Sequence, residues 1–156
     1  MDDANLQANR IANHMIGNEG TAKVWGTTYE DGGVGWSRVS FIVKPDMLNG
    51  FKAIHGGMIF ALADSAFAYA CNSENKVTVA QQASIAFLSP AYAGEKLTAV
   101  AKREAGEGRS AVYNVVVTGP DERVVATFQG LSRTIRGHIL EAVSYTHLTL
   151  PTIYSV

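Results

Sequence analysis

The sequence predicts one α+β domain in which an antiparallel sheet of about five or six strands curls around a single apolar helix. Three observations support this prediction. Runs of alternating apolar and polar residues fill most of the chain and are separated by short turns rich in Gly and Pro. A stretch of helical length, residues 53–73, carries one formal charge, at Asp64. The chain has 156 residues, of which 47% are hydrophobic, enough for one core and too few for two ordinary domains.

The first part of the chain predicts a helix followed by a hairpin. Small and apolar residues recur at helical spacing up to Gly17, which indicates an amphipathic helix. Strands are expected at residues 23–29 and 36–43, with a glycine-rich turn between them. An irregular segment, residues 46–55, leads into the apolar helix, which is expected at residues 58–71. Because that helix is apolar nearly all round, it belongs inside a domain.

The rest of the domain is predicted to contain strands alone, at residues 77–87, 95–104, 109–118 and 123–135. The turns between them are short, and parallel neighbours would need crossover connections of about a dozen residues or more, so we expect an antiparallel sheet. This order of elements predicts an α+β domain and resembles that of the hotdog fold. We expect a single domain at residues 1–136 and a C-terminal extension at 137–156, in which residues 143–156 resemble a translated vector linker and are set aside as non-native.

Composition excludes several classes of function. Lys and Arg number 13 against 14 Asp and Glu, a formal charge of -1, so no net positive field attracts nucleic acid or anionic lipid. The single cysteine, Cys71, cannot form an intramolecular disulfide or a thiolate metal cage and is expected to be a core residue. The first residues lack the pattern of a secretory signal, which predicts a cytoplasmic protein. A membrane span at residues 53–73 is excluded because polar residues interrupt it.

Asp64 is the most informative residue, because it is a lone carboxylate in an apolar helix. Burying an ionised carboxylate without partners is costly, so a chain that keeps one there either pairs it or uses it. Asp64 is therefore a candidate catalytic group. The plainer interpretation is that it caps a helical segment beginning at Ser65 or anchors a neighbouring loop.

His55, Gly56 and Gly57 stand where this helix begins. The two glycines leave their backbone amides bare, so their N–H groups and the helix dipole converge on an oxygen that develops negative charge. The arrangement predicts an oxyanion hole, and the alternative is an ordinary glycine-rich helix start. Asn49-Gly50, by itself, is most simply a turn.

The spacing of these features predicts a site shared by two chains. Gly57 and Asp64 are seven residues apart in the sequence, so they lie on nearly the same helix face but about 10 Å apart along the axis. Reacting atoms must approach to about 3–3.5 Å. The Asp64 of one chain therefore cannot serve its own helix N-terminus. If both act on one substrate, a second, antiparallel copy of the helix must supply Asp64, and the active species is a two-fold homodimer.

The segment around these residues resembles the active-site segment of hotdog-fold acyl-CoA thioesterases of the PaaI-like, phenylacetic acid degradation family. The resemblance rests on Leu48-Asn49-Gly50 and on the continuous run from His55-Gly56-Gly57 through Ala63-Asp64-Ser65 to Cys71-Asn72-Ser73. It implies that Asp64 is the nucleophile or general base and that the Gly56 N–H binds the thioester carbonyl, with the Gly57 amide beside it. Asn49 and His55 are then expected to position the carbonyl and the attacking water.

One position departs from the family pattern. Some members place a serine on the following strand to orient the water, and Ala80 stands there in this chain. We expect Gln82 or Ser84 to substitute, or the water to rely on Asn49.

The resemblance implies hydrolysis of aryl- or phenylacetyl-type acyl-CoA to free acid and CoA by a homotetramer built from two dimers. CoA is part of the substrate, and no metal or redox cofactor is expected. Four basic residues are candidates either for contacts with CoA phosphates or for solvated strand ends: Lys102, Arg103, Arg109 and Arg133. Two other functions stay open. A hotdog hydroxyacyl-CoA dehydratase would move protons with His55 and Asp64, and a non-catalytic acyl-CoA-binding domain would only hold the ligand.

Overall fold

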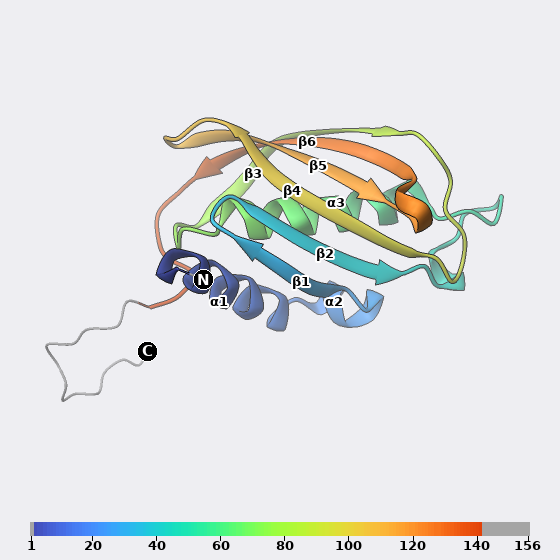
Figure 1. Cartoon of the computed structure of the whole chain (residues 1–156), viewed down its shortest axis with the longest axis horizontal. Coiled ribbons are helices and arrows are strands. Elements are labelled where there is room, and N and C mark those ends of the chain that lie inside the picture. The colour runs from blue at the N-terminus through green and yellow to red at the C-terminus, as the bar shows by residue number, and fades with distance from the viewer. Residues whose placement is uncertain (1, 142–156) are drawn as a thin grey trace, which may run out of the picture.

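The computed structural model describes residues 2–141 and confirms the α+β fold, with a six-stranded antiparallel sheet around one helix. Figure 1 shows this helix, α3, along one face of the sheet and a second helix, α1, beside the first strands. The helices are α1 (Asp3–Gly17), α2 (Gly20–Trp25) and α3 (Gly56–Cys71). The strands are β1 (Thr28–Gly33), β2 (Trp36–Ile42), β3 (Thr78–Phe87), β4 (Lys96–Ala105), β5 (Ser110–Thr118) and β6 (Val124–Thr134). Short 3₁₀ turns lie at Pro45–Met47 and Pro120–Glu122.

Strand order in the sheet is β1-β2-β4-β5-β6-β3, and every neighbouring pair is antiparallel. The sequence predicted antiparallel pairing but not the position of β3. Although β3 and β4 are consecutive in the chain, they do not pair; β3 lies at the far edge and pairs with β6, with Ile85 opposite Phe128. The strand that follows the central helix is therefore an edge strand.

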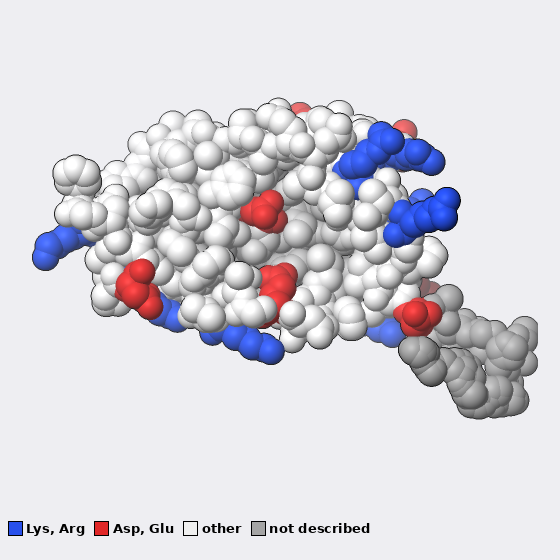
Figure 2. Space-filling model, turned by 180° about the vertical axis from the view of Figure 1, so that it is seen from behind, with Lys and Arg blue, Asp and Glu red and all other residues white. Residues whose placement is uncertain are grey.

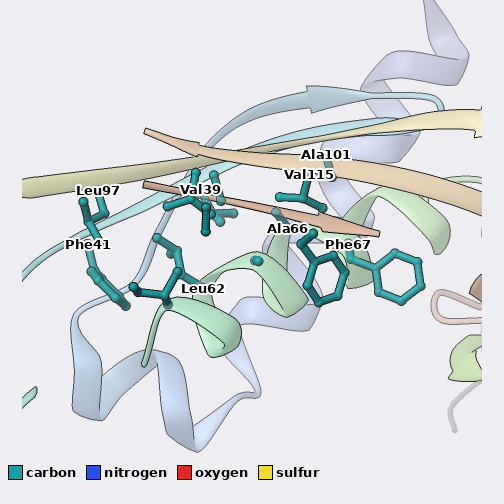
Figure 3. Packing of buried hydrophobic residues seen from close by; sticks show 14 of the residues in the cluster. Val39, Phe41, Leu62, Ala66, Phe67, Leu97, Ala101 and Val115 are labelled. Carbon is teal, nitrogen blue, oxygen red and sulfur yellow. The ribbon is translucent and has the colours of Figure 1, made fainter. Parts of the chain in front are cut away.

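The core lies between the inner face of the sheet and α3 (Figure 3). Leu62, Ala66 and Phe67 of α3 pack with Val39 of β2, and each of these side chains is at most 1% exposed. Helix and sheet approach closely, since a Cβ on Gly130 of β6 would lie 2.7 Å from the Phe67 ring. Such packing fixes α3 as a rigid element, so residues along it keep their separation.

The N-terminal region differs from the prediction. The strand expected at residues 23–29 is wrong, because Gly20–Trp25 form α2 and the strand begins at Thr28. Val24 and Trp25 favour a strand by propensity. Gly26, however, adopts a left-handed φ of 68° and ends the short helix as its C-cap, and this cap decides the local structure.

The two edges of the sheet contrast. Helix α1 covers the β1 edge, where Asn9 Nδ2 donates to the Gly32 carbonyl at 2.9 Å. On the opposite edge the outer side of β3 has no neighbouring strand among residues 2–141, and Val79 and Phe87 are 44% and 53% exposed. Residues 77–94 contain no charged residue. Charges on an edge strand normally discourage pairing with another chain, and β3 lacks them.

The chain after β6 returns to the turn between α3 and β3. Asn75 Oδ1 accepts the N–H groups of Ile139 and Leu140 at 3.1 and 2.8 Å. The folded unit thus includes residues just beyond 136, while the domain boundary itself stays a prediction. The tail set aside above, residues 143–156, lies outside the described residues. Within residues 2–141, none of the helices has the length and apolar character needed to cross a membrane.

Candidate active site

The N-terminus of α3 is capped by the histidine that precedes it. His55 has an extended backbone, with φ -65° and ψ 136°, and its Nδ1 accepts a hydrogen bond from the Gly57 N–H at 2.9 Å. Helix α3 therefore begins at Gly56, earlier than the predicted start at Met58. Because Nδ1 accepts, the proton of a neutral His55 imidazole is on Nε2, which becomes the donor of the ring.

The two glycine amides differ in what they can bind. We expected both to face a carbonyl oxygen, but the Gly57 N–H is committed to His55. The Gly56 N–H has no acceptor among residues 2–141. As the first helical residue, Gly56 also stands at the positive end of the helix dipole. One amide donor, instead of the expected two, is available to an incoming oxygen.

Asn49 is held by the loop that precedes α3. Its Oδ1 accepts the N–H groups of Phe51 and Ala53 at 2.9 and 3.2 Å, and its own N–H donates to the Ala53 carbonyl at 2.8 Å. A bridge between Leu48 and Ile54 closes the loop. With Oδ1 occupied, the side chain can offer only Nδ2 as a donor, and Nδ2 has no acceptor in the described chain.

Asn49 and Gly56 line one cleft, a cavity of about 420 Å³. The rest of its lining is apolar except for one serine and comprises Ala53, Ile54, Ile59, Phe87, Leu88, Ser89 and Pro90. Phe87, at the end of β3, lies against Gly56: a Cβ on residue 56 would be 3.0 Å from Cζ of the ring. Apolar surroundings strengthen hydrogen bonds from the donors that remain, so the cleft suits a polarised carbonyl.

Asp64 does not line this cleft. It lies on α3 about 12 Å from Gly56 along the helix axis, and it is half-buried. Burial raises the pKa of its carboxyl, and the negative charge of Glu19 raises that pKa further. Within residues 2–141 its side chain has no hydrogen bond or ion pair, and α3 runs through it without a break. The capping and loop-anchoring interpretations of Asp64 therefore have no support.

Sequence reasoning missed a second carboxylate beside Asp64. Glu19 precedes α2, and its Oε1 accepts a hydrogen bond from the Tyr69 hydroxyl at 2.5 Å. Burial, first, and the Glu19 contact, second, raise the pKa of that hydroxyl, so Tyr69 stays protonated and holds Glu19 in place. Fifty residues separate the two along the chain. No local pattern signals such a contact, and only the tertiary packing that brings the α1–α2 junction to α3 creates it.

The residues expected to orient water lie on the exposed edge strand. A bulge separates Ala80 from Gln82, and the Gln82 side chain makes no hydrogen bond within the described chain. Ser84 lines a different hollow, with Asn114 and Gln129. None of the three lines the Gly56 cleft of its own chain, so their roles stay predictions.

The other candidates divide between committed and unpaired groups. Burial raises the pKa of Cys71 to about 12, which keeps a neutral thiol packed against the core. Arg103 is committed, with Nη2 2.7 Å from Glu74 and Nε 3.0 Å from the Tyr113 hydroxyl. The remaining basic candidates make no salt bridge in the described chain: Lys102, Arg109 and Arg133. Among residues 2–141 no three His, Cys, Asp or Glu side chains gather in a way that could hold a metal ion.

Comparison with known proteins identifies the class. A family model described as "Thioesterase superfamily" matches residues 51–126. The acyl-coenzyme A thioesterase PaaI of Escherichia coli strain K12 is 39% identical over 128 residues, which cover 82% of this chain and 91% of that protein. A putative esterase of Archaeoglobus fulgidus is 40% identical over 96 residues, 62% of each chain.

The chain therefore belongs to the thioesterase superfamily, and the predicted hotdog thioesterase fold is confirmed. The structure of the E. coli PaaI protein matches with a TM-score of 0.85 at 37% identity, over 87% of this chain and 99% of that one. A mutant structure of the phenylacetic acid degradation protein PaaI of Thermus thermophilus matches with a TM-score of 0.72 at 30% identity, over 75% and 100%. The chain is a thioester hydrolase, and these relatives do not support the dehydratase or binding-only alternatives.

Proposed function

We propose that the chain hydrolyses aryl- or phenylacetyl-type acyl-CoA thioesters to the free acid and CoA. The observation that carries this proposal is the unpaired Gly56 N–H, which opens with Asn49 into an apolar cleft. A thioester under attack develops negative charge on its carbonyl oxygen, and fixed donors in such a cleft stabilise that charge. The names of the E. coli and T. thermophilus relatives support the reaction and the acyl class.

In the proposed mechanism the carbonyl oxygen accepts the Gly56 N–H, and Asn49 Nδ2 donates to that oxygen or to the attacking water. Asp64 of a second chain is the base or the nucleophile. As a base it takes a proton from water, whose oxygen bonds to the acyl carbon. The C–S bond then breaks, and the CoA thiolate takes up the proton. As a nucleophile, Asp64 first forms an anhydride that water hydrolyses to the same products.

The second chain is proposed to join through the edge strand β3. This strand is exposed and uncharged, so its unpaired backbone groups are a template for another strand. Antiparallel pairing of two copies of β3 across a two-fold axis would continue the sheet and set the two α3 helices antiparallel. Asp64 of each chain then faces the Gly56 cleft of the other. The separation of about 12 Å between Gly56 and Asp64 along one helix is then no obstacle, because the two groups that act together come from different chains.

The outer face of the sheet supports the further pairing of dimers into a homotetramer. Over β3, β5 and β6 it is hollowed by a cavity of about 520 Å³. Its lining has no charged residue and comprises Ser84, Ile85, Ala86, Asn114, Val115, Val116, Thr127, Phe128 and Gln129. A cytoplasmic location completes the proposal, because the lone thiol of Cys71 suits a reducing compartment.

Phe87 supports an aromatic acyl group. Its ring lies against Gly56, so an acyl group whose carbonyl oxygen binds the Gly56 N–H would lie beside the ring. Contacts between aromatic rings add about 0.5–1.5 kcal/mol beyond the area that they bury. A straight chain in the same place would make only ordinary apolar contacts.

Release of free thiol from a panel of acyl-CoAs tests the proposal. We expect phenylacetyl-CoA and related aryl thioesters to have higher kcat/KM than straight-chain acyl-CoAs, and D64N to release almost no thiol. Thiol release that is unchanged in D64N would overturn the site. Consumption of crotonyl-CoA without thiol release would instead indicate a dehydratase.

A further inference from the structure

A group of unpaired cations lies at one end of the sheet. Four residues, called here the strand-end patch, are exposed and make no salt bridge in the part of the chain that the structure describes: Lys76, Arg109, Arg133 and Arg136. Figure 2 shows Lys and Arg side chains gathered at the right-hand end of the molecule. The whole chain has a formal charge of -1, so this patch is a local feature.

Backbone pairing holds the strand-end patch at the start of β3. Arg133 of β6 pairs with Val79, the second residue of β3. The carbonyl of Arg109 accepts a hydrogen bond from the N–H of Thr134, the residue after Arg133, at 2.7 Å. Lys76 and Arg136 flank the same pairing, because the N–H of residue 77 donates to the carbonyl of residue 137 at 3.1 Å. The four cations therefore belong to one corner of the sheet.

Nearby acidic residues do not neutralise the strand-end patch. Glu74 is paired with Arg103 at 2.7 Å. Glu104 and Glu107 are exposed near the turn between β4 and β5, and Glu141 is exposed next to Leu140, whose N–H donates to Asn75. None of the three lies within salt-bridge distance of a described cation. The patch thus keeps a local excess of positive charge that can bind an anion.

The opposite end of the sheet, which carries the Gly56 cleft, has fewer unpaired cations that could bind an anion. Arg123 there contacts Glu95 at 3.1 Å and the Pro90 carbonyl at 3.3 Å. Lys44 donates to a backbone carbonyl at 3.1 Å, which leaves Lys52 as the cation of the cleft loop without an ion pair in the described chain. An acyl-CoA carries a diphosphate and a 3′-phosphate, and one lysine is a poor match for that charge.

Antiparallel pairing of two β3 edges would bring the strand-end patch to the cleft of the other chain. In such a pairing the start of one strand lies beside the end of its neighbour. Strand β3 starts at the strand-end patch and ends at Phe87, which lies against Gly56. The patch of each chain is then at the mouth of the other chain's cleft, and it belongs to the chain that supplies Asp64.

We propose that the strand-end patch binds the nucleotide phosphates of an acyl-CoA whose thioester lies in the Gly56 cleft of the second chain. This inference rests on the proposed function and on pairing through β3. Arginine suits the role because its planar guanidinium forms paired, charge-assisted hydrogen bonds with phosphate oxygens. One chain thus supplies the acid and the phosphate contacts, and the other supplies the carbonyl donors.

The double variant Arg109→Gln/Arg133→Gln, assayed with two substrates, tests the proposal. For phenylacetyl-CoA we expect KM to rise about tenfold with kcat unchanged, since two exposed phosphate contacts are lost. S-phenylacetyl-pantetheine lacks the nucleotide, so its kinetics should not change. Arg10→Gln/Lys23→Gln, on α1 and α2, removes the same charge away from β3 and should leave both substrates unaffected. The rise in KM should shrink in high salt, because exposed charges are screened.

The outcomes separate the two proposals. If the unmodified chain hydrolyses neither substrate, the proposed function fails. If it hydrolyses both, and the arginine variant alters KM for both equally or for neither, the function stands and the strand-end patch is not a phosphate site.

A hybrid dimer tests which chain's strand-end patch is used. D64N chains are co-expressed in large excess over Arg109→Gln/Arg133→Gln chains, which alone carry an affinity tag, and the tagged particles are isolated. Nearly every arginine-variant chain is then paired with a D64N chain, and D64N homodimers contribute no activity. The working site then combines the cleft of the D64N chain with Asp64 and the altered patch of the other chain. We expect the raised KM for phenylacetyl-CoA. An ordinary KM would mean that each patch serves its own cleft and would overturn the inference.

Discussion

The first and third turns of α3 hold the two groups that the proposed mechanism brings together. In the first turn the Gly56 N–H has no acceptor in the described chain and opens into an apolar cleft that contains no acid. In the third turn Asp64 has no donor within residues 2–141 and lies near a second carboxylate, Glu19. A rigid helix holds the two about 12 Å apart. The difference teaches that the first turn lacks an acid and the third turn lacks a donor. A two-fold copy of the helix would supply the missing group to each.

The largest effect is expected from the third turn. D64N removes the proposed base or nucleophile while keeping the shape of the side chain, so kcat should fall about 10²- to 10⁴-fold. Thiol release measures the loss, and circular dichroism checks that the fold is kept. A variant with at least a tenth of the original activity would contradict the assignment.

The same substitution should make the protein more stable at neutral pH. The raised pKa of Asp64 means that the folded protein holds this proton more tightly than the unfolded chain does. Ionisation therefore destabilises the fold as pH rises through the folded pKa, and stability is greatest below the unfolded pKa. D64N should have a higher Tm at pH 7 and no advantage at pH 3. A lower Tm at pH 7 would indicate that the ionised Asp64 has a stabilising partner.

In the first turn, Gly56→Pro should remove the donor with little harm to the helix. Proline is favoured at the first helical position, and the extended His55 is compatible with a following proline. Loss of one oxyanion donor costs about 10²- to 10³-fold in kcat. The control, Gly56→Ala, adds a Cβ that displaces the Phe87 ring but keeps the N–H. Equal losses in both variants would indicate that crowding, not the missing N–H, is responsible.

Phe87→Ala should change which acyl group is preferred. The ratio of kcat/KM for phenylacetyl-CoA to that for decanoyl-CoA should fall about two- to tenfold, the equivalent of one ring contact. Tyr92→Ala is a control, since Tyr92 is a similarly exposed aromatic residue that does not line the cleft. An unchanged ratio in Phe87→Ala would mean that the acyl group lies elsewhere.

The smallest effect is expected from Glu19→Gln, which removes a negative charge near Asp64 but can still accept from Tyr69. The pKa of Asp64 should fall, so the acid limb of the pH profile of kcat/KM should move to lower pH while the plateau stays the same. Tyr69→Phe breaks the hydrogen bond and keeps the charge, and it should leave that limb in place. An acid limb that moves to higher pH in Glu19→Gln would contradict the assigned sign.

The sequence alone predicted those site residues whose type is unusual for their local surroundings. A single acid in an apolar helix and two glycines at its start pointed to Asp64 and Gly56, and their spacing predicts a site shared by two chains. Contacts between distant segments could not be read in the same way. The Glu19–Tyr69 hydrogen bond and the position of β3 beside β6 depend on tertiary packing. The cap from Gly57 to His55 depends on one side-chain rotamer. The strand predicted at residues 23–29 was wrong because Gly26, as the C-cap of α2, outweighs the strand propensity of the residues before it.

Complementation between two inactive chains tests the shared site most directly. D64N and Gly56→Pro chains, co-expressed in equal amounts, form hybrid dimers in which one site combines an intact Gly56 with an intact Asp64. The mixture should regain about a quarter of the original activity, because about half of the dimers are hybrids and each has one working site. Activity no greater than the sum of the two separate variants would contradict a site built from two chains.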